Sequence, residues 1–199
     1  MPVELLSALV AFAFVSSITP GPNNLMLMAS GANFGFRRTL PHMMGVGIGF
    51  TLMIVLVGVG LIKVFDTWPV TYTIMKVLSV LYLSWLAWKI ANASAPGKAD
   101  ADGRPITFLQ AALFQWVNPK AWAMALTAIA AYAPARDIWA VGLVALIFGA
   151  VNLPSISFWT LLGLQVRRVL KSPGRLRAFN WTMAALLMLS LVPVLWPMG

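Results

Sequence analysis

Long apolar blocks occupy most of this sequence and limit what it can fold into. A helix that crosses a bilayer needs about 20 mostly apolar residues, and six blocks of that kind account for nearly all 199 residues. The chain is 60% hydrophobic and only 10% charged, with a mean hydropathy of +0.85. Ordinary soluble domains carry about 25% charged residues. We therefore predict an all-α integral membrane protein, a single membrane domain whose main partner is the lipid bilayer.

Six transmembrane helices are predicted, at residues 5–28, 41–62, 69–91, 106–133, 138–165 and 178–197. The first block lacks a basic leader and a small-residue cleavage site, so we expect a retained span and not a signal peptide. A linker-like segment, residues 92–105, separates repeat one (1–91) from repeat two (106–199). With three spans each, the halves must insert in opposite directions, which predicts two inverted three-helix repeats.

The basic residues predict the orientation in the membrane. Ten follow spans one, three and five: Arg37, Arg38, Lys89, Lys98, Arg104, Arg167, Arg168, Lys171, Arg175 and Arg177. The opposite side carries Lys63 and Arg136 with the acids Glu4, Asp66 and Asp137. Positively charged loops stay in the cytoplasm, so both termini are expected outside. The pI near 10.7 then reflects membrane orientation, and no nucleic-acid partner is expected.

Spans one and four contain sequences that cannot continue a helix. Span one holds the run from Thr19 to Asn24, TPGPNN, and span four holds Asn118, Pro119 and Lys120. Each proline lacks an N–H group and clashes with the preceding turn. Both breaks come about 13 to 16 residues into their spans, roughly 20 Å along a helix. Irregular backbone survives at that depth only inside protein or beside a cavity, so helices 1 and 4 should border a polar site.

The predicted substrate-binding residues lie at these breaks or near them: Pro20, Gly21, Pro22, Asn23, Asn24, Gln115, Asn118, Pro119, Lys120 and Asn152, with Lys76 as a further candidate. Asn23 or Asn24 is expected to cap the second half of span one. The N–H groups freed at that helix start would suit a substrate carboxylate, with help from Lys120. Asparagine side chains would contact the amine.

Two further polar residues, Asn152 and Lys76, each have two possible roles. Asn152 with Pro154 interrupts span five and either lines the cavity or caps a kink. Lys76 either joins the site or snorkels to the outer interface. His42, the single histidine, is expected at the cytoplasmic interface and not as a proton carrier. The chain has no cysteine, which argues against a metal site, and no cofactor is expected. Close helix packing is predicted for three small-residue pairs: Gly31/Gly35, Gly45/Gly49 and Ala145/Gly149.

Three segments resemble the LysE/RhtB family of amino-acid exporters: residues 18–50 (ITPGPNNLMLMASGANFGFRRTLPHMMGVGIGF), 75–91 (MKVLSVLYLSWLAWKIA) and 108–124 (FLQAALFQWVNPKAWAM). The PGPNN and WLAWKIA runs look most like the cysteine/O-acetylserine exporter branch. The resemblance covers residues 1 to about 135 well and the last two spans more loosely. It implies a bacterial inner-membrane protein that exports amino acids or close derivatives.

The residues of this chain that match the family's motif are Pro20, Gly21, Pro22, Asn23, Asn118, Pro119 and Lys120. Many members carry aspartate where this chain has Asn23. This chain therefore lacks an obvious carboxylate for proton coupling or amine binding at that position. Ser79 stands where a glycine is usual, a change that affects packing.

Alternative functions stay open at this point. Export of another small solute or of a cation is one, and a membrane-embedded enzyme is another. An enzyme would normally need titratable or nucleophilic groups clustered at depth, and the predicted spans contain no aspartate or glutamate at depth. Without a phosphate-binding loop for ATP, proton or sodium coupling is the default, and passive efflux fits the same residues. The glycine-rich faces allow a homodimer.

Overall fold

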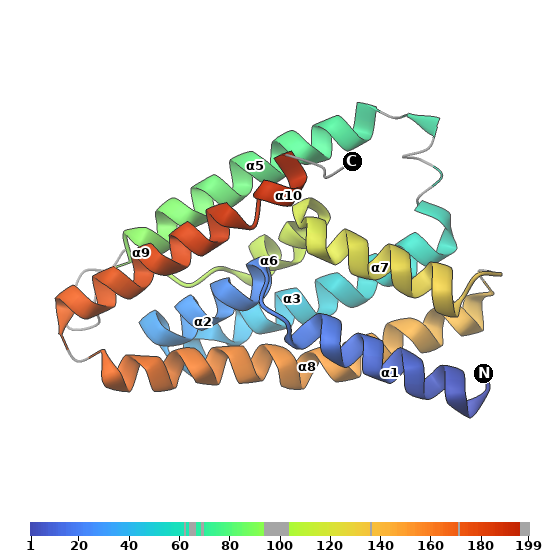
Figure 1. The fold of residues 1–199 in the computed structure, drawn as a ribbon, viewed down its shortest axis with the longest axis horizontal. Coiled ribbons are helices and arrows are strands. Elements are labelled where there is room, and N and C mark those ends of the chain that lie inside the picture. Colours follow the sequence, from blue (N-terminus) through green and yellow to red (C-terminus); the bar gives the residue numbers. More distant parts are fainter. Residues whose placement is uncertain are drawn as a thin grey trace.

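The computed structural model describes residues 1–61, 63, 67–68, 70–93, 104–135, 137–170 and 172–195, so most of the predicted linker lies outside the described residues. Within these ranges the chain is helical and contains no strand, which confirms the all-α prediction. Figure 1 shows the arrangement. The elements are α1 (Val3–Ile18), α2 (Pro22–Phe34), α3 (Phe36–Leu56), η1 (Val57–Leu61), α5 (Val70–Ala91), α6 (Phe108–Phe114), η2 (Gln115–Val117), α7 (Pro119–Tyr132), α8 (Ile138–Val169), α9 (Pro173–Leu189) and α10 (Val192–Leu195).

Three stretches of helix in the described residues are long and apolar enough to cross a membrane: Phe36–Leu61, Thr73–Ala91 and Ile138–Val169. The pair α1 and α2 qualifies together as a fourth, broken span with a bend of 54°. The apolar helix Phe108–Val117 is shorter. Large apolar side chains remain exposed along the helices, as on Leu109, Trp139 and Leu146. The protein is therefore a multi-pass membrane protein, and the count of six spans stays a prediction.

The predicted connection between spans one and two is wrong in its extent. Residues 29–40 are helical except at Gly35, where α2 ends and α3 begins one residue later. Gly35 has φ +78°, a conformation that glycine adopts without steric cost. The hydroxyl of Thr39 donates to the Gly35 carbonyl at 2.8 Å and strengthens this turn. Arg37 and Arg38 therefore lie in the first turn of α3 and not in a loop.

The expected interruption of span five at Asn152 and Pro154 is also wrong. Helix α8 runs without a break through Pro154. A proline removes one backbone hydrogen bond from a membrane helix, and neighbouring helices can hold such a helix together. Here α1, α2 and α3 all pack along α8. The basic residues Arg167 and Arg168 form its last turn, beyond the predicted end at residue 165.

Two packed layers of helices can be followed in Figure 1. Along one flank α5 pairs with α9, and on the other side α8 packs against α1, α2 and α3, while α3 also packs against α6. A buried pair of amides joins these layers. The Asn33 amide nitrogen donates to Asn180 Oδ1 at 2.8 Å, and Asn180 returns a bond of 3.1 Å to Asn33 Oδ1. This pair connects α2 with α9, and the sequence did not single it out.

Glycines permit the closest helix contacts. A Cβ on Gly31 would collide with the Thr160 carbonyl of α8, and one on Gly163 of α8 would collide with the Met28 carbonyl of α2. Gly45 and Gly49 approach α6 in the same way. The predicted packing role is thus confirmed for Gly31, Gly45 and Gly49. It is wrong for Gly35, which has open space around it and serves the turn.

The expectation for His42 is wrong as well. Its side chain is completely buried, and neither ring nitrogen has a hydrogen-bond partner among the described residues. Helix α3 begins at Phe36, five residues before the predicted span, so His42 lies in its second turn. At that position the ring packs inside the helix bundle and is not exposed on the protein surface, as an interfacial side chain would be.

Gly163→Ala should destabilise the protein by about 1–3 kcal/mol, because the added methyl group forces α2 and α8 apart. Gly142→Ala is the matched control on α8: nothing lies within 4 Å of its Cβ position, so alanine should stabilise the helix by about 0.5–1 kcal/mol. Thermal unfolding in detergent measures both. Equal melting temperatures for Gly163→Ala and wild type would contradict the close α2–α8 contact.

Candidate functional site

The first helix break is a short extended segment. Helix α1 ends at Ile18 and α2 begins at Pro22, with Thr19 at ψ 143° and Gly21 at φ −173° and ψ 176°. Pro22 occupies the first position of α2, where a missing N–H costs nothing and the fixed φ suits the helix. The proline that ends one helix and the proline that begins the next are therefore separated by a single glycine.

The Asn24 side chain makes hydrogen bonds to the carbonyls at the end of α1 and not to the N–H groups at the start of α2. Its amide nitrogen donates to the carbonyls of Ser17 and Thr19, each at 2.8 Å. The N-cap residue of α2 is Gly21, with no side-chain hydrogen bond. The expectation that Asn23 or Asn24 caps α2 is thus wrong, because the unpaired carbonyls of α1 take the Asn24 side chain. The first backbone N–H groups of α2 stay without a side-chain cap.

Helix α8 supplies two more donors to the same helix end. The hydroxyl of Ser155 donates to the Ser17 carbonyl at 2.8 Å. One turn later on α8, the indole N–H of Trp159 donates to the Ile18 carbonyl at 3.0 Å. The last carbonyls of a helix have no partner within it, so α8 and Asn24 together close the end of α1.

The second helix break is a single residue, Asn118, with φ −93° and ψ 108°. Its side-chain oxygen accepts the backbone N–H of Lys120 at 3.1 Å, so Asn118 caps α7. Pro119 takes the first position of α7, as Pro22 does in α2. The two breaks also differ at the helix start that follows: Asn118 caps α7, whereas no side chain caps α2.

Side chains join the two breaks directly. Asn23 and Gln115, 92 residues apart, exchange two amide hydrogen bonds of 2.8 and 3.1 Å. The ammonium group of Lys120 donates to the carbonyl of Thr19 at 2.6 Å and to its hydroxyl at 2.9 Å. The ammonium also approaches the carbonyl of Pro20 at 3.4 Å. The structure therefore brings together the two segments that the sequence predicted to border one polar site.

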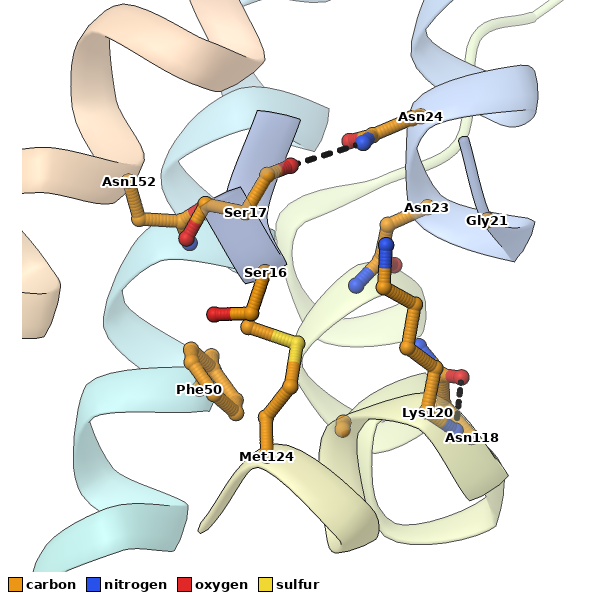
Figure 2. Close-up of a pocket in the computed structure, with 11 residues that line it drawn as sticks. Ser16, Ser17, Gly21, Asn23, Asn24, Phe50, Asn118, Lys120, Met124 and Asn152 are labelled. Carbon is orange, nitrogen blue, oxygen red and sulfur yellow. Dashed lines mark hydrogen bonds between the residues drawn. The ribbon is translucent and has the colours of Figure 1, made fainter. Parts of the chain in front are cut away.

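A pocket of about 340 Å³ opens where the breaks meet (Figure 2). Six of the predicted site residues line it: Gly21, Asn23, Asn24, Asn118, Lys120 and Asn152. The lining does not include the prolines of the breaks, which shape the backbone. Gln115 is fully buried against Asn23. Lys76 on α5 lines neither this pocket nor a second one near Lys89.

Sequence reasoning missed the remaining lining residues: Ser16, Ser17, Phe50, Ala121 and Met124. For some of them the sequence held a clue. Ser16 and Ser17 come directly before the first break, and Met124 follows Lys120 by one helical turn. Phe50 could not have been found, since nothing distinguishes it from other apolar residues of an apolar span.

The lining offers polar groups and one cation. Lys120 supplies a positive charge, and the uncapped start of α2 supplies backbone N–H groups with the positive end of its helix dipole. Asparagine side chains add donors and acceptors. No carboxylate lines the pocket, and the described residues contain no group of three or more histidine, cysteine, aspartate or glutamate side chains. This set of groups suits a small polar solute with an anionic end.

Comparison with known proteins gives a consistent result. The LysE type translocator family matches residues 14–194. The chain is 27% identical over 190 residues to a cysteine/O-acetylserine efflux protein of Klebsiella pneumoniae, covering 94% of this chain and 95% of that protein. It is 29% identical over 181 residues to the proteins of that name from Escherichia coli K12 and Shigella sonnei, covering 88% of this chain and 90% of each. No solved structure matches the chain.

Adjacent asparagines should respond differently to the same substitution. Asn24→Asp removes two donated hydrogen bonds and sets a carboxylate against two carbonyls, so it should destabilise the protein by at least about 1–3 kcal/mol. Asn23→Asp keeps an acceptor for the Gln115 amide and loses only the one bond donated to Gln115, and because Asn23 is only half-buried its carboxylate can turn toward the pocket, so the loss of stability should be smaller. Thermal unfolding in detergent compares the two variants. If both lose the same stability, the Asn24 side chain does not close α1.

Proposed function

The chain belongs to the LysE type translocator family and is a transporter, not an enzyme, and we propose that it exports small amino acids or close derivatives across the bacterial inner membrane. The proposal takes its substrate class from the names of the relatives and its site from the pocket between the two breaks. Export of another solute or of a cation has less support, because no carboxylate lines the pocket.

The observation that carries this proposal is the pairing of an uncapped helix start with Lys120 in one pocket. Backbone N–H groups at a helix N-terminus attract anions, and the start of α2 lacks a side-chain cap. Lys120 lies against Gly21, where a Cβ would stand only 2.6 Å from its Cδ. A substrate carboxylate placed here would contact both groups. The amide oxygens of Asn24 and Asn118 would face the substrate's ammonium group.

Transport then requires the pocket to open to each side of the membrane in turn. We propose the six-span arrangement of two inverted repeats, 1–91 and 106–199, joined by the linker 92–105. The helix pairing supports this arrangement, because each repeat packs on the other in the same way. The broken helix of repeat one (α1 and α2) packs on α8, and the broken helix of repeat two (α6 and α7) packs on α3, which is the counterpart of α8. The last helices of the two repeats, α5 and α9, pack on each other. Rocking of one repeat against the other would alternate access to a fixed site.

The basic residues support the orientation with both termini in the periplasm. Arg38 lies over the ring of Phe34 at 5.5 Å, where α2 ends. Lys89 and Arg104 line a second cavity that Phe34 also borders. These charges, from three separate segments, gather at one end of the bundle. By the positive-inside rule that end faces the cytoplasm.

Energy coupling is proposed as proton or sodium exchange, with passive efflux as its alternative. No pocket residue is an acid, so a coupling ion would have to use other groups. The glycine-rich helix faces do not support a homodimer, because Gly31, Gly45 and Gly49 pack against other helices of the same chain.

Proteoliposome transport of a labelled amino-acid panel, with and without a pH gradient, tests substrate and coupling together. Lys120→Met keeps the side-chain stem and removes the charge, so it should lower kcat/KM about 10-fold or more for the best substrate, the loss that follows from about 1.4 kcal/mol of binding energy. Lys63→Met, outside the pocket, is the matched control and should transport normally. An active Lys120→Met variant would remove this cation from the site.

Single-cysteine labelling tests the orientation, because the chain contains no cysteine. A membrane-impermeant maleimide should label Pro2→Cys in intact inner membranes from the periplasmic side. Gly174→Cys, an exposed position beside Arg175, should react only after the membrane is opened. Labelling of Gly174→Cys from outside would invert the proposed topology.

A further inference from the structure

We propose that Ser17 and Asn152 form a subsite that selects substrates with a short, uncharged, oxygen-bearing side chain. This inference rests on the proposed export of amino acids and assigns one part of the same pocket. Neither the helix breaks nor the positive charge of Lys120 explains what these two residues do.

The hydroxyl of Ser17 is buried and has no hydrogen-bond partner in the described structure. The side chain is only 4% exposed and lines the pocket. A buried hydroxyl without a partner costs about 1–3 kcal/mol, and native proteins rarely leave one so. The adjacent Ser16 is different, because its hydroxyl donates to the Phe12 carbonyl at 2.6 Å. The Ser17 hydroxyl is therefore a hydrogen-bond donor and acceptor without a partner, on a residue of the pocket wall.

Asn152 lies on the helix that packs directly against Ser17. Ser155 of α8 donates to the Ser17 carbonyl at 2.8 Å, and Asn152 stands three residues earlier, on the same face of that helix. The Asn152 side chain is 6% exposed and lines the pocket. Figure 2 shows it directed toward Ser17. Its amide could donate and accept, and within the described residues it takes part in no hydrogen bond.

The position of the pair indicates which part of a substrate it would contact. In Figure 2, Ser17 and Asn152 lie on one side of the pocket and Lys120 lies on the other. A carboxylate held at Lys120 and α2 would leave the substrate's side chain directed toward Ser17 and Asn152. The apolar side chains of Phe50 and Met124 also line the pocket and would limit the size of that group.

The chemistry of the pair favours a hydroxyl or a carbonyl over hydrocarbon or charge. A hydrocarbon side chain would bury the Ser17 hydroxyl and the Asn152 amide without partners, and a site built to bond a polar group rejects the analogue that lacks it. A cationic side chain would meet no opposite charge, since the only ionisable group in the lining is Lys120. An anionic side chain would find that one cation already occupied by the substrate's own carboxylate on the other side of the pocket. The subsite therefore distinguishes serine-like side chains from aliphatic ones of equal size.

Labelled serine and its methyl isostere 2-aminobutyrate are the probes, measured separately in proteoliposomes. Wild type should transport serine with at least about 10-fold higher kcat/KM, a ratio that corresponds to 1.4 kcal/mol. Ser17→Ala and Asn152→Leu should bring the ratio close to one, mainly by slowing serine. Ser17→Ala removes an unpaired hydroxyl, so the variant should fold and insert normally.

Ser79→Ala is the matched control. Its hydroxyl is also buried in a helix, but it donates to the Met75 carbonyl at 2.7 Å and lies outside the pocket. This variant should keep the wild-type ratio. A Ser17→Ala protein that transports well with an unchanged ratio would overturn the subsite and leave the proposed export intact. Wild type that transports no amino acid of the panel would overturn the proposed function, and the subsite with it.

Discussion

The carbonyl groups at the end of α1 impose the constraint on which the site depends. This helix stops partway along a broken span, and at membrane depth each carbonyl left without a partner would cost several kcal/mol. Side chains from three other helices supply the missing donors: Asn24 from α2, Ser155 and Trp159 from α8, and Lys120 from α7. A broken helix is stable here because its neighbours complete its hydrogen bonds.

The same donors fix the geometry of the pocket. Because Asn24 closes α1, it leaves the start of α2 uncapped, and the N–H groups that a side chain would otherwise satisfy are available to a ligand. Lys120 joins the breaks through Thr19, and the Asn23–Gln115 amide pair holds them together a second time. The same side chains therefore complete the hydrogen bonds at the end of α1 and leave the N–H groups at the start of α2 free. A substitution at Asn24 or Lys120 affects both helix ends.

Several predictions from sequence held because they depend on local chemistry. The Pro-Gly-Pro run and the Asn-Pro pair disfavour helix through their own backbone chemistry, so the breaks at Pro20 and Asn118 could be located without tertiary information. Others failed because packing decided them. Pro154 lies in an unbroken helix that its neighbours hold. His42 is completely buried in α3, which begins earlier than its apolar run. Gly35 could not be told from Gly31, since only the structure shows which glycine meets another backbone.

By itself the sequence determined that this is a helical membrane protein with two broken helices, because apolar run length and proline chemistry act within one segment. It also placed asparagines and a lysine at the breaks. The tertiary structure decided which carbonyl each of those side chains satisfies, and it added Ser16, Ser17 and Phe50 to the pocket. These assignments depend on residues about a hundred positions apart, and no local pattern encodes which donor reaches which acceptor across that separation.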